Sequence, residues 1–228
     1  MTKNLIFDLD DTLIKTTQHY INSEIYFVNL MAANGAPKDE AKELIKQIDL
    51  KLLSEYKYGY HWFQRGLIEG YKILSKKYNF KIENFENLIA EKIKAEFETE
   101  RELWDNAEEI LKYFYDLHYT MYIMTLGDYN IQMSKIKKTS IEQYFKKIFV
   151  VSKKDDDDYK NLIKETNINP NESWFIGNSI EHDITPALKF GFNCVLYNKH
   201  TTFYGMKLEI PKNVIVISDL LELKKIIK

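Results

Sequence analysis

After residue 104 the sequence alternates between short apolar runs and segments of helical periodicity, and this alternation constrains the fold more strongly than any other feature. Strand and helix in turn imply right-handed crossovers, and therefore a parallel sheet with helices on its faces. One of the helices is expected to open with a capping box formed by Asp105 and Glu108. The expected strands are 5–7, 119–125, 147–152, 173–177, 193–198 and 214–218, and the expected helices are 105–118, 129–138, 157–166, 183–191 and 219–228.

The segment between residues 16 and 103 has helical periodicity alone. Apolar residues recur at i, i+3, i+4 and i+7 spacing over 41–52 and 85–97, which predicts amphipathic helices. Gly35 and Gly59 are expected to separate the first three helices of this segment, so that about four helices and no strand fill it. The predicted organisation is an α/β domain formed by residues 1–15 and 104–228, with an all-helical domain inserted at residues 16–103.

Composition restricts the class of protein. A chain of 228 residues with 45% hydrophobic and 29% charged residues is typical of a globular protein. The net charge of −2 shows no basic surplus, so no nucleic-acid partner is expected, and no run of about 20 apolar residues indicates a membrane span. The single Cys194 forms no internal disulfide and is predicted to lie in the core. Without a signal-peptide pattern, the expected location is the cytoplasm.

Polar residues gather where the predicted strands end, which is where parallel sheets bind ligands. Asp8 and Asp10 project to the same side of an extended segment, roughly 6–7 Å apart. Two carboxylates so close repel each other unless a cation intervenes, and Mg²⁺ with a phosphate group supplies one. Asp183, at another strand end, can complete such a metal site. The strand-end residues are Asp8, Asp10 and Thr12; Thr125, Gly127 and Asp128; Lys153 and Lys154; and Gly177, Asn178, Ser179 and Asp183.

These residue types suit phosphoryl transfer. Asp8 can act as nucleophile, because a carboxyl of ordinary pKa is already ionised at neutral pH. Asp10 can protonate the departing alkoxide and then activate a water molecule. Thr125 and the backbone amides around Leu126 and Gly127 are expected to hold phosphoryl oxygens, with a lysine at a strand end stabilising the nucleophile and the transferring group.

Four segments in order, "DLDDT", "MTLGD", the lysines of "VVSKKDDDDY" and "FIGNSIEHD", resemble the motifs of the haloacid dehalogenase-like (HAD) superfamily. The resemblance implies a Rossmann-like fold, Mg²⁺-dependent phosphatase activity and a helical cap inserted after the first motif. It also implies Asp8 as nucleophile and metal ligand, Asp10 as acid/base and as a metal ligand through its backbone carbonyl, and Asp183 as a metal ligand or its close support. Lys154, five residues before Tyr159, matches the motif lysine, and Lys153 is the competitor.

Asn178 departs from the motif, which often begins with Gly-Asp, and an amide can bind metal only through a neutral oxygen. The departure leaves two alternatives open: a metal-independent 2-haloacid dehalogenase, and a phosphate-binding protein without turnover. Asp10 favours the phosphatase, because a halide leaves without protonation and the dehalogenases lack this second aspartate. The aspartates at 155–158 are interpreted as a solvated face rather than as a second metal site.

Substrate choice is expected to lie in the cap, because the core site recognises only phosphate. Arg65 can bind a substrate carboxylate or a second phosphate, and His19 and Tyr20 follow the first motif closely enough to face the active site. The aromatic residues around Arg65 are interpreted as the cap's own core and its seam with the main domain, and His19 and Tyr20 can equally be ordinary surface residues. The predicted substrate is a small phosphorylated metabolite of unspecified identity, and the sequence makes no prediction of oligomeric state.

Overall fold

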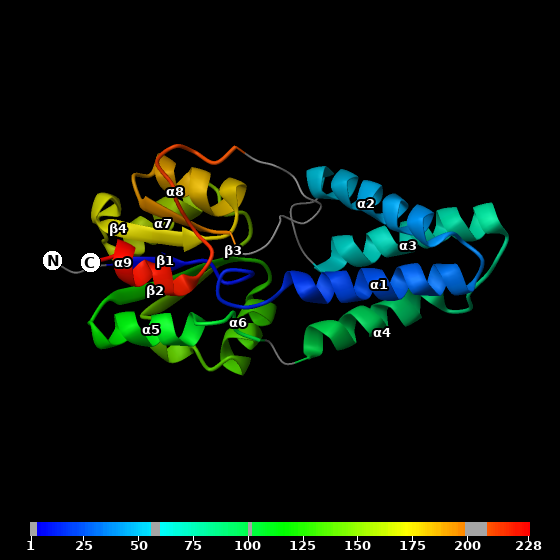
Figure 1. The fold of residues 1–228 in the computed structure, drawn as a ribbon, viewed down its shortest axis with the longest axis horizontal. Coiled ribbons are helices and arrows are strands. Elements are labelled where there is room, and N and C mark those ends of the chain that lie inside the picture. The colour runs from blue at the N-terminus through cyan, green and yellow to red at the C-terminus, as the bar shows by residue number, and fades with distance from the viewer. Residues whose placement is uncertain (1–3, 56–59, 100–101, 199–208) are drawn as a thin grey trace. The chain divides into compact units, whose positions relative to one another are not determined.

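The protein is described by a computed structural model covering residues 4–55, 60–99, 102–198 and 209–228 (Figure 1). It divides into two compact units, which we call the core unit (Met1–Lys15 with Glu100–Lys228) and the inserted unit (Thr16–Thr99). The predicted boundary at residues 103 and 104 lies slightly too far along the chain. Lys15 N–H donates to the Glu102 carbonyl at 2.9 Å and Ile14 pairs with Leu103, so residues 102–103 already belong to the core unit.

The core unit contains a six-stranded sheet in the order β3-β2-β1-β4-β5-β6, with every adjacent pair parallel. This is the Rossmann order, in which the chain turns to opposite sides of β1 and leaves a crevice at the carboxyl ends of β1 and β4. The expected α/β fold is therefore confirmed. The strands are β1 (Asn4–Phe7), β2 (Thr120–Leu126), β3 (Lys147–Val151), β4 (Ser173–Gly177), β5 (Asn193–Tyr197) and β6 (Ile215–Ile217).

Two apolar clusters cover the two faces of this sheet. Leu5 and Phe7 of β1 point into one cluster and Ile6 into the other, as period-two alternation requires. The first cluster includes α5 and α9, and the second includes α7, α8 and the buried Cys194. Figure 1 shows α7 and α8 on the side of the sheet opposite α5. The helices are α5 (Ala107–Asp116), α6 (Tyr129–Lys138), α7 (Asp156–Thr166), α8 (Thr185–Lys189) and α9 (Leu223–Ile226), with a π-helix at Ile180–Ile184 and 3₁₀ turns at Glu142–Tyr144, Pro170–Glu172 and Leu220–Glu222.

The start of α5 corrects the sequence-based expectation. The N-cap is Asn106, in the left-handed region at φ 67°, and no side-chain hydrogen bond caps the helix, so the box predicted from Asp105 and Glu108 is wrong. The Asn106 amide instead donates to the Asp219 carboxylate at 2.9 Å. Asp219 itself caps the last 3₁₀ turn together with Glu222, so this one carboxylate serves two element ends.

The inserted unit consists of four helices in its described part: α1 (Thr17–Ala33), α2 (Lys38–Glu55), α3 (Tyr60–Tyr78) and α4 (Phe85–Glu98). Gly35 lies between α1 and α2 as expected, whereas the break predicted at Gly59 lies outside the described residues. A methyl group added to Gly70 of α3 would lie 2.5 Å from Ile45 Cδ1, so α2 and α3 pack closely there. Tyr71 also stacks on Phe85 at 3.9 Å between ring centroids.

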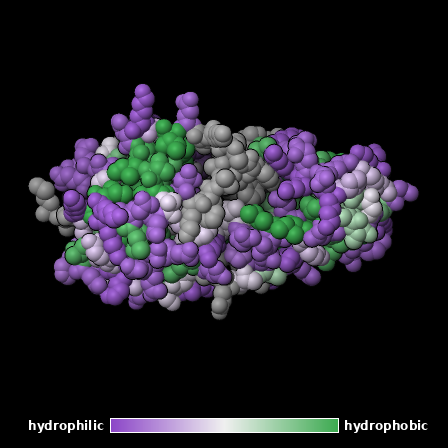
Figure 2. All heavy atoms as spheres, viewed as in Figure 1, coloured by the Kyte–Doolittle hydropathy of each residue, from purple (hydrophilic) through white to green (hydrophobic). Residues whose placement is uncertain are grey.

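The described surface is mostly hydrophilic on the face viewed in Figure 2, with separate hydrophobic patches. None of the helices in the described ranges combines the length and the apolar character needed to cross a membrane.

Candidate functional site

Asp8 follows β1 directly and is anchored through both its backbone and its side chain. Its N–H donates to the Ile176 carbonyl of β4 at 2.9 Å, which holds it between the two strands. The next residues turn back, with Asp11 at φ 58°, and bring Thr12 to the Asp8 side chain. The Thr12 hydroxyl donates to Asp8 Oδ2 at 3.0 Å and lies 3.4 Å from Asn178 Oδ1. The first and fourth motifs therefore meet at this point.

Lys154 joins Asp8 to Asp183. Its Nζ lies 2.5 Å from Asp8 Oδ1 and 2.6 Å from Asp183 Oδ1, and its side chain is only 2% exposed. The backbone of Lys154 adopts φ 53°, a left-handed conformation that is unfavourable for a residue with a side chain and that turns Lys154 inward. Lys153 is exposed. Of the two candidates for the motif lysine, the structure places Lys154 at the site.

Asp183 is held in the π-helix that follows β4. Its Oδ2 accepts from the Ser179 backbone N–H at 2.9 Å, while its Oδ1 faces Lys154. The residue is 1% exposed. Gly177 makes room for it, since an added Cβ would lie 2.5 Å from the Asp183 side chain. The glycine of the fourth motif is thus required by the close approach of this carboxylate.

Burial and charge perturb the protonation of this cluster. Burial raises the pKa of Asp8 to about 7, with Lys154 opposing the shift and Asp183 adding to it. Burial also opposes the charge on Lys154, but Asp183 and Asp8 outweigh it and raise the pKa of its ammonium. The pKa of Asp8 therefore lies above the ordinary value expected from the sequence. One ammonium does not fully compensate two buried carboxylates.

Asp10 is held by two residues of α6 that the sequence-based reasoning missed. Lys135 Nζ lies 2.7 Å from Asp10 Oδ1, and Gln132 Nε2 lies 2.7 Å from Asp10 Oδ2. Gln132 and Lys135 are both buried, three residues apart on one face of the helix. This spacing relative to the buried Ile136 is the sequence signal that could have predicted that both polar side chains face inward.

Gln132 also connects Asp10 to the end of β2. Its Nε2 lies 2.5 Å from the buried Thr125 Oγ1 and 3.2 Å from the Leu126 carbonyl oxygen. Thr125 lies within β2, and α6 is capped by Asp128. The Gly127 amide, predicted to bind phosphate, instead donates to the Val151 carbonyl at 2.9 Å because pairing with β3 continues past the end of β2. Phosphate binding by Thr125, the Leu126 amide and Lys154 stays a prediction.

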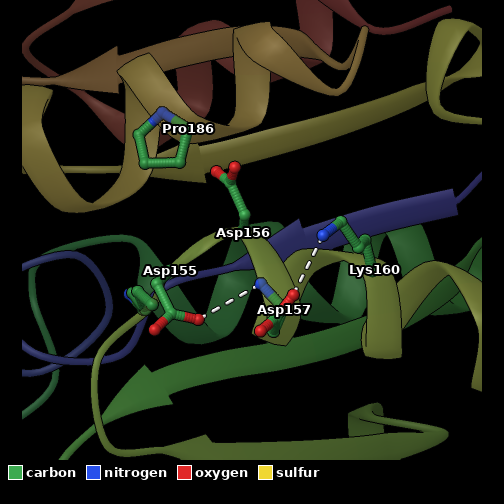
Figure 3. Close-up of a pocket in the computed structure, with 6 residues that line it drawn as sticks. Asp155, Asp156, Asp157, Lys160 and Pro186 are labelled. Carbon is green, nitrogen blue, oxygen red and sulfur yellow. Dashed lines mark hydrogen bonds and ion pairs between the residues drawn. The ribbon is translucent and has the colours of Figure 1, made fainter.

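A pocket at the start of α7 contains Lys154 but is otherwise built by a different set of residues (Figure 3). Asp155 caps the helix and forms a capping box with Asp158. Asp156 pairs with Lys189, and Asp157 pairs with Lys160. These aspartates are engaged in capping and surface ion pairs, in agreement with their interpretation as a solvated face.

The residues predicted to select the substrate lie in the inserted unit. His19 Nδ1 lies 3.6 Å from Glu96 Oε2, and Tyr20 packs edge-on against the buried Phe63 at 5.1 Å between ring centroids. Arg65 lies on α3 with its side chain exposed. Tyr20 is half-buried and is therefore not an ordinary surface residue, and the selective roles of all three residues stay predictions.

The side-chain oxygens of the core site are of the chemical types that bind Mg²⁺ in proteins. Asp8 and Asp183 offer carboxylate oxygens, and Asn178 offers an amide oxygen. Burial, with the nearby Asp183 carboxylate adding to it, raises the pKa of Asp8, and a further cation would oppose that shift. Within the described ranges, however, no three Asp, Glu, His or Cys side chains are grouped closely enough to form a metal site by themselves. Water and phosphate oxygens would have to complete the coordination.

Comparison with known proteins gives a family match over most of the chain. The model of the haloacid dehalogenase-like hydrolase family matches residues 5–197. No curated protein shows significant similarity to the sequence.

Solved structures with the same fold cover nearly the whole chain. A haloacid dehalogenase-like hydrolase from Xanthomonas campestris has a TM-score of 0.80 at 21% identity, covering 99% of this chain and 94% of its own. The HAD-hydrolase YfnB from Bacillus subtilis, bound to magnesium, has a TM-score of 0.69 at 21% identity, and the match covers 99% of this chain and 98% of its own. The L-2-haloacid dehalogenase from Xanthobacter autotrophicus has a TM-score of 0.64 at 15% identity, and the match covers 100% of this chain and 98% of its own. Both phosphatases and dehalogenases are represented among the similar structures.

Proposed function

Because the chain belongs to the haloacid dehalogenase-like hydrolases, we propose that it is a Mg²⁺-dependent phosphomonoester hydrolase acting on a small phosphorylated metabolite. Asp10 is the observation that carries the choice of reaction. Its carboxyl is fixed beside the Thr125 end of β2 by Gln132 and Lys135. An alkoxide leaving group needs a proton from such a carboxyl, whereas a halide needs none.

Asp8 is the nucleophile in this proposal. One of its carboxylate oxygens attacks phosphorus and forms an aspartyl-phosphate, the bond from phosphorus to the ester oxygen breaks, and Asp10 gives its proton to the departing oxygen. Water then attacks the same phosphorus, Asp10 takes the proton from that water, and the bond from phosphorus to Asp8 breaks. Free phosphate leaves, and both carboxyl groups return to their starting states.

The residues around Asp8 support this role by orientation and charge. Thr12 and Lys154 each bind one of its oxygens, so the carboxylate cannot rotate away from the strand end. Lys154 lies close enough to share its charge with a transferring phosphoryl group. Thr125 accepts from Gln132 through its oxygen, which keeps its own hydrogen available to donate to a phosphoryl oxygen.

Mg²⁺, when bound, would neutralise the carboxylates and the phosphate, held by side-chain oxygens of Asp8, Asp183 and Asn178 and by the backbone carbonyl of Asp10. The raised pKa of Asp8 supports this part of the proposal, since a protonated carboxyl is a poor nucleophile and a nearby cation favours its ionised form. Selection of the metabolite is proposed to involve His19, Tyr20 and Arg65 of the inserted unit.

Asn178 favours the second candidate function, a metal-independent 2-haloacid dehalogenase. The amide contributes no charge, and its Oδ1 lies near the Thr12 hydroxyl at 3.4 Å. In that reaction Asp8 would displace the halide from carbon, and Asp10 would have no part in the chemistry.

Hydrolysis of p-nitrophenyl phosphate with Mg²⁺ and with EDTA tests the proposal, and chloride release from 2-chloropropionate runs alongside. We expect nitrophenol release that requires Mg²⁺ and disappears in Asp8→Asn, with no chloride release. Chloride release that is insensitive to EDTA would establish the dehalogenase instead. Phosphate binding without turnover of either substrate would show that the site binds but does not catalyse.

A further inference from the structure

Both carboxylate oxygens of Asp10 are held by α6, and the two contacts come from different kinds of donor. The Lys135 ammonium lies 2.7 Å from Oδ1, with its side chain 8% exposed and that of Asp10 26% exposed. The Gln132 amide lies 2.7 Å from Oδ2. A carboxylate bound at both oxygens has a fixed plane and a fixed rotation about its χ2 angle.

The packing of the core does not account for these two side chains. The neighbouring Ile136 is fully buried in the apolar cluster, whereas Gln132 and Lys135 are buried against the carboxylate of Asp10. Burying an ammonium is unfavourable through desolvation, and an ion pair with a partly exposed partner does not recover that cost in full. Lys137, on the same helix, lies exposed to solvent, which is the usual position of a lysine, whereas Lys135 is buried.

Gln132 connects Asp10 to the proposed phosphate site. The same Nε2 that binds Asp10 lies 2.5 Å from Thr125 Oγ1. Gly127 approaches the Gln132 side chain so closely that an added Cβ would lie 3.3 Å from Cδ. The position of Gln132 therefore fixes the acid of the first motif relative to the threonine of the second.

We propose that Gln132 and Lys135 are positioning residues that orient the Asp10 carboxyl for proton transfer to the leaving group. This inference rests on the phosphatase function proposed above. A misplacement of about 1 Å at such a group lowers a rate by about 100-fold, so the effect is large enough to measure.

The dependence of the rate on the leaving group separates this role from a merely structural one. Phenol is a weaker acid than p-nitrophenol, so phenyl phosphate needs the proton from Asp10 and p-nitrophenyl phosphate needs it much less. The two esters are otherwise nearly the same in shape. Damage to the fold or to phosphate binding lowers kcat/KM for both esters, whereas a misplaced acid lowers it for phenyl phosphate.

The experiment measures kcat/KM for both esters with Mg²⁺ in the wild type, Gln132→Leu, Lys135→Met and the matched control Lys137→Met. We expect Gln132→Leu and Lys135→Met to lose about 10- to 100-fold more on phenyl phosphate than on p-nitrophenyl phosphate. Lys137→Met should retain the wild-type ratio. Lys135→Arg, which keeps the charge and a donor, should recover much of the loss.

A double-mutant cycle gives the second arm. In an Asp10→Asn background no acid is left to position, so Lys135→Met should change the ratio of the two esters no further. Parallel losses on both esters in an active enzyme, or a further loss in the Asp10→Asn background, would overturn the positioning role alone. A wild type inactive on both esters would remove the proposed function, and this inference with it. Thermal melting of each variant shows whether it is folded.

Discussion

Replacing Lys154 by methionine tests the charge balance of the site. The Lys154 side chain is 2% exposed, and its ammonium contacts Asp8 and Asp183, whose side chains are 7% and 1% exposed. Methionine fills a similar volume but leaves two buried carboxylates without their cation. Breaking a buried ion pair in this way costs about 3–5 kcal/mol of unfolding free energy, and we expect a loss in that range at pH 7.5.

The loss should depend on pH in a definite direction. The pKa of Asp8 is raised to about 7, so at pH 5 its carboxyl is already neutral in the wild type and Lys154 compensates Asp183 alone. The destabilisation by Lys154→Met should therefore be smaller at pH 5 than at pH 7.5. Adding Asp183→Asn to Lys154→Met removes one of the orphaned carboxylates and should restore part of the stability at pH 7.5.

Urea unfolding of the metal-free protein, followed by circular dichroism, measures these differences. Lys153→Met is the matched control, because Lys153 is exposed and its loss should change the unfolding free energy by no more than about 0.5 kcal/mol. If Lys154→Met and Lys153→Met unfold at the same urea concentration at pH 7.5, the described ion pairs do not stabilise the core unit and the reasoning fails.

Three further predictions concern the same site. Asp8→Asn should abolish phosphatase turnover without lowering the melting temperature, because it removes a carboxylate whose burial is unfavourable; wild-type rates in this variant would exclude Asp8 as nucleophile. Asn178→Asp should tighten Mg²⁺ binding in a calorimetric titration, and an unchanged affinity would show that this side chain is not a ligand. The pKa of Asp8 in the folded protein lies above its ordinary value of 3.8. The Asp8 contribution to the free energy of unfolding is therefore fully present below pH 3.8 and is lost as the pH rises through about 7. Mg²⁺ should therefore raise the melting temperature more at pH 7.5 than at pH 5, and equal shifts would contradict the charge balance.

The strands of the core could be predicted from the sequence because the physical signal is local. A parallel strand covered on both faces appears as a continuous apolar run, as at Leu5 to Phe7, and the alternation with helices then restricts the topology. The residues after those strands were found for the same reason. Asp8, Lys154 and Asp183 each follow a different strand, and a parallel sheet brings such positions together.

The missed features depend on partners far away in the sequence. Gln132 and Lys135 bind a carboxylate 122 and 125 residues away, and nothing in the local pattern of α6 identifies Asp10 as that partner. The capping box predicted for α5 is wrong for a similar reason, because the Asn106 amide donates to Asp219, 113 residues along the chain. The raised pKa of Asp8 follows mainly from its burial, a property of the assembled core that the sequence around Asp8 does not reveal.

Mass spectrometry of acid-quenched enzyme during turnover tests the central claim most directly. With Mg²⁺ and p-nitrophenyl phosphate, the proposed chemistry predicts a phosphate adduct on the side chain of Asp8, absent when EDTA is present. Steady turnover with a phosphate adduct on a different residue, or with no adduct under conditions where dephosphorylation is rate-limiting, would contradict it.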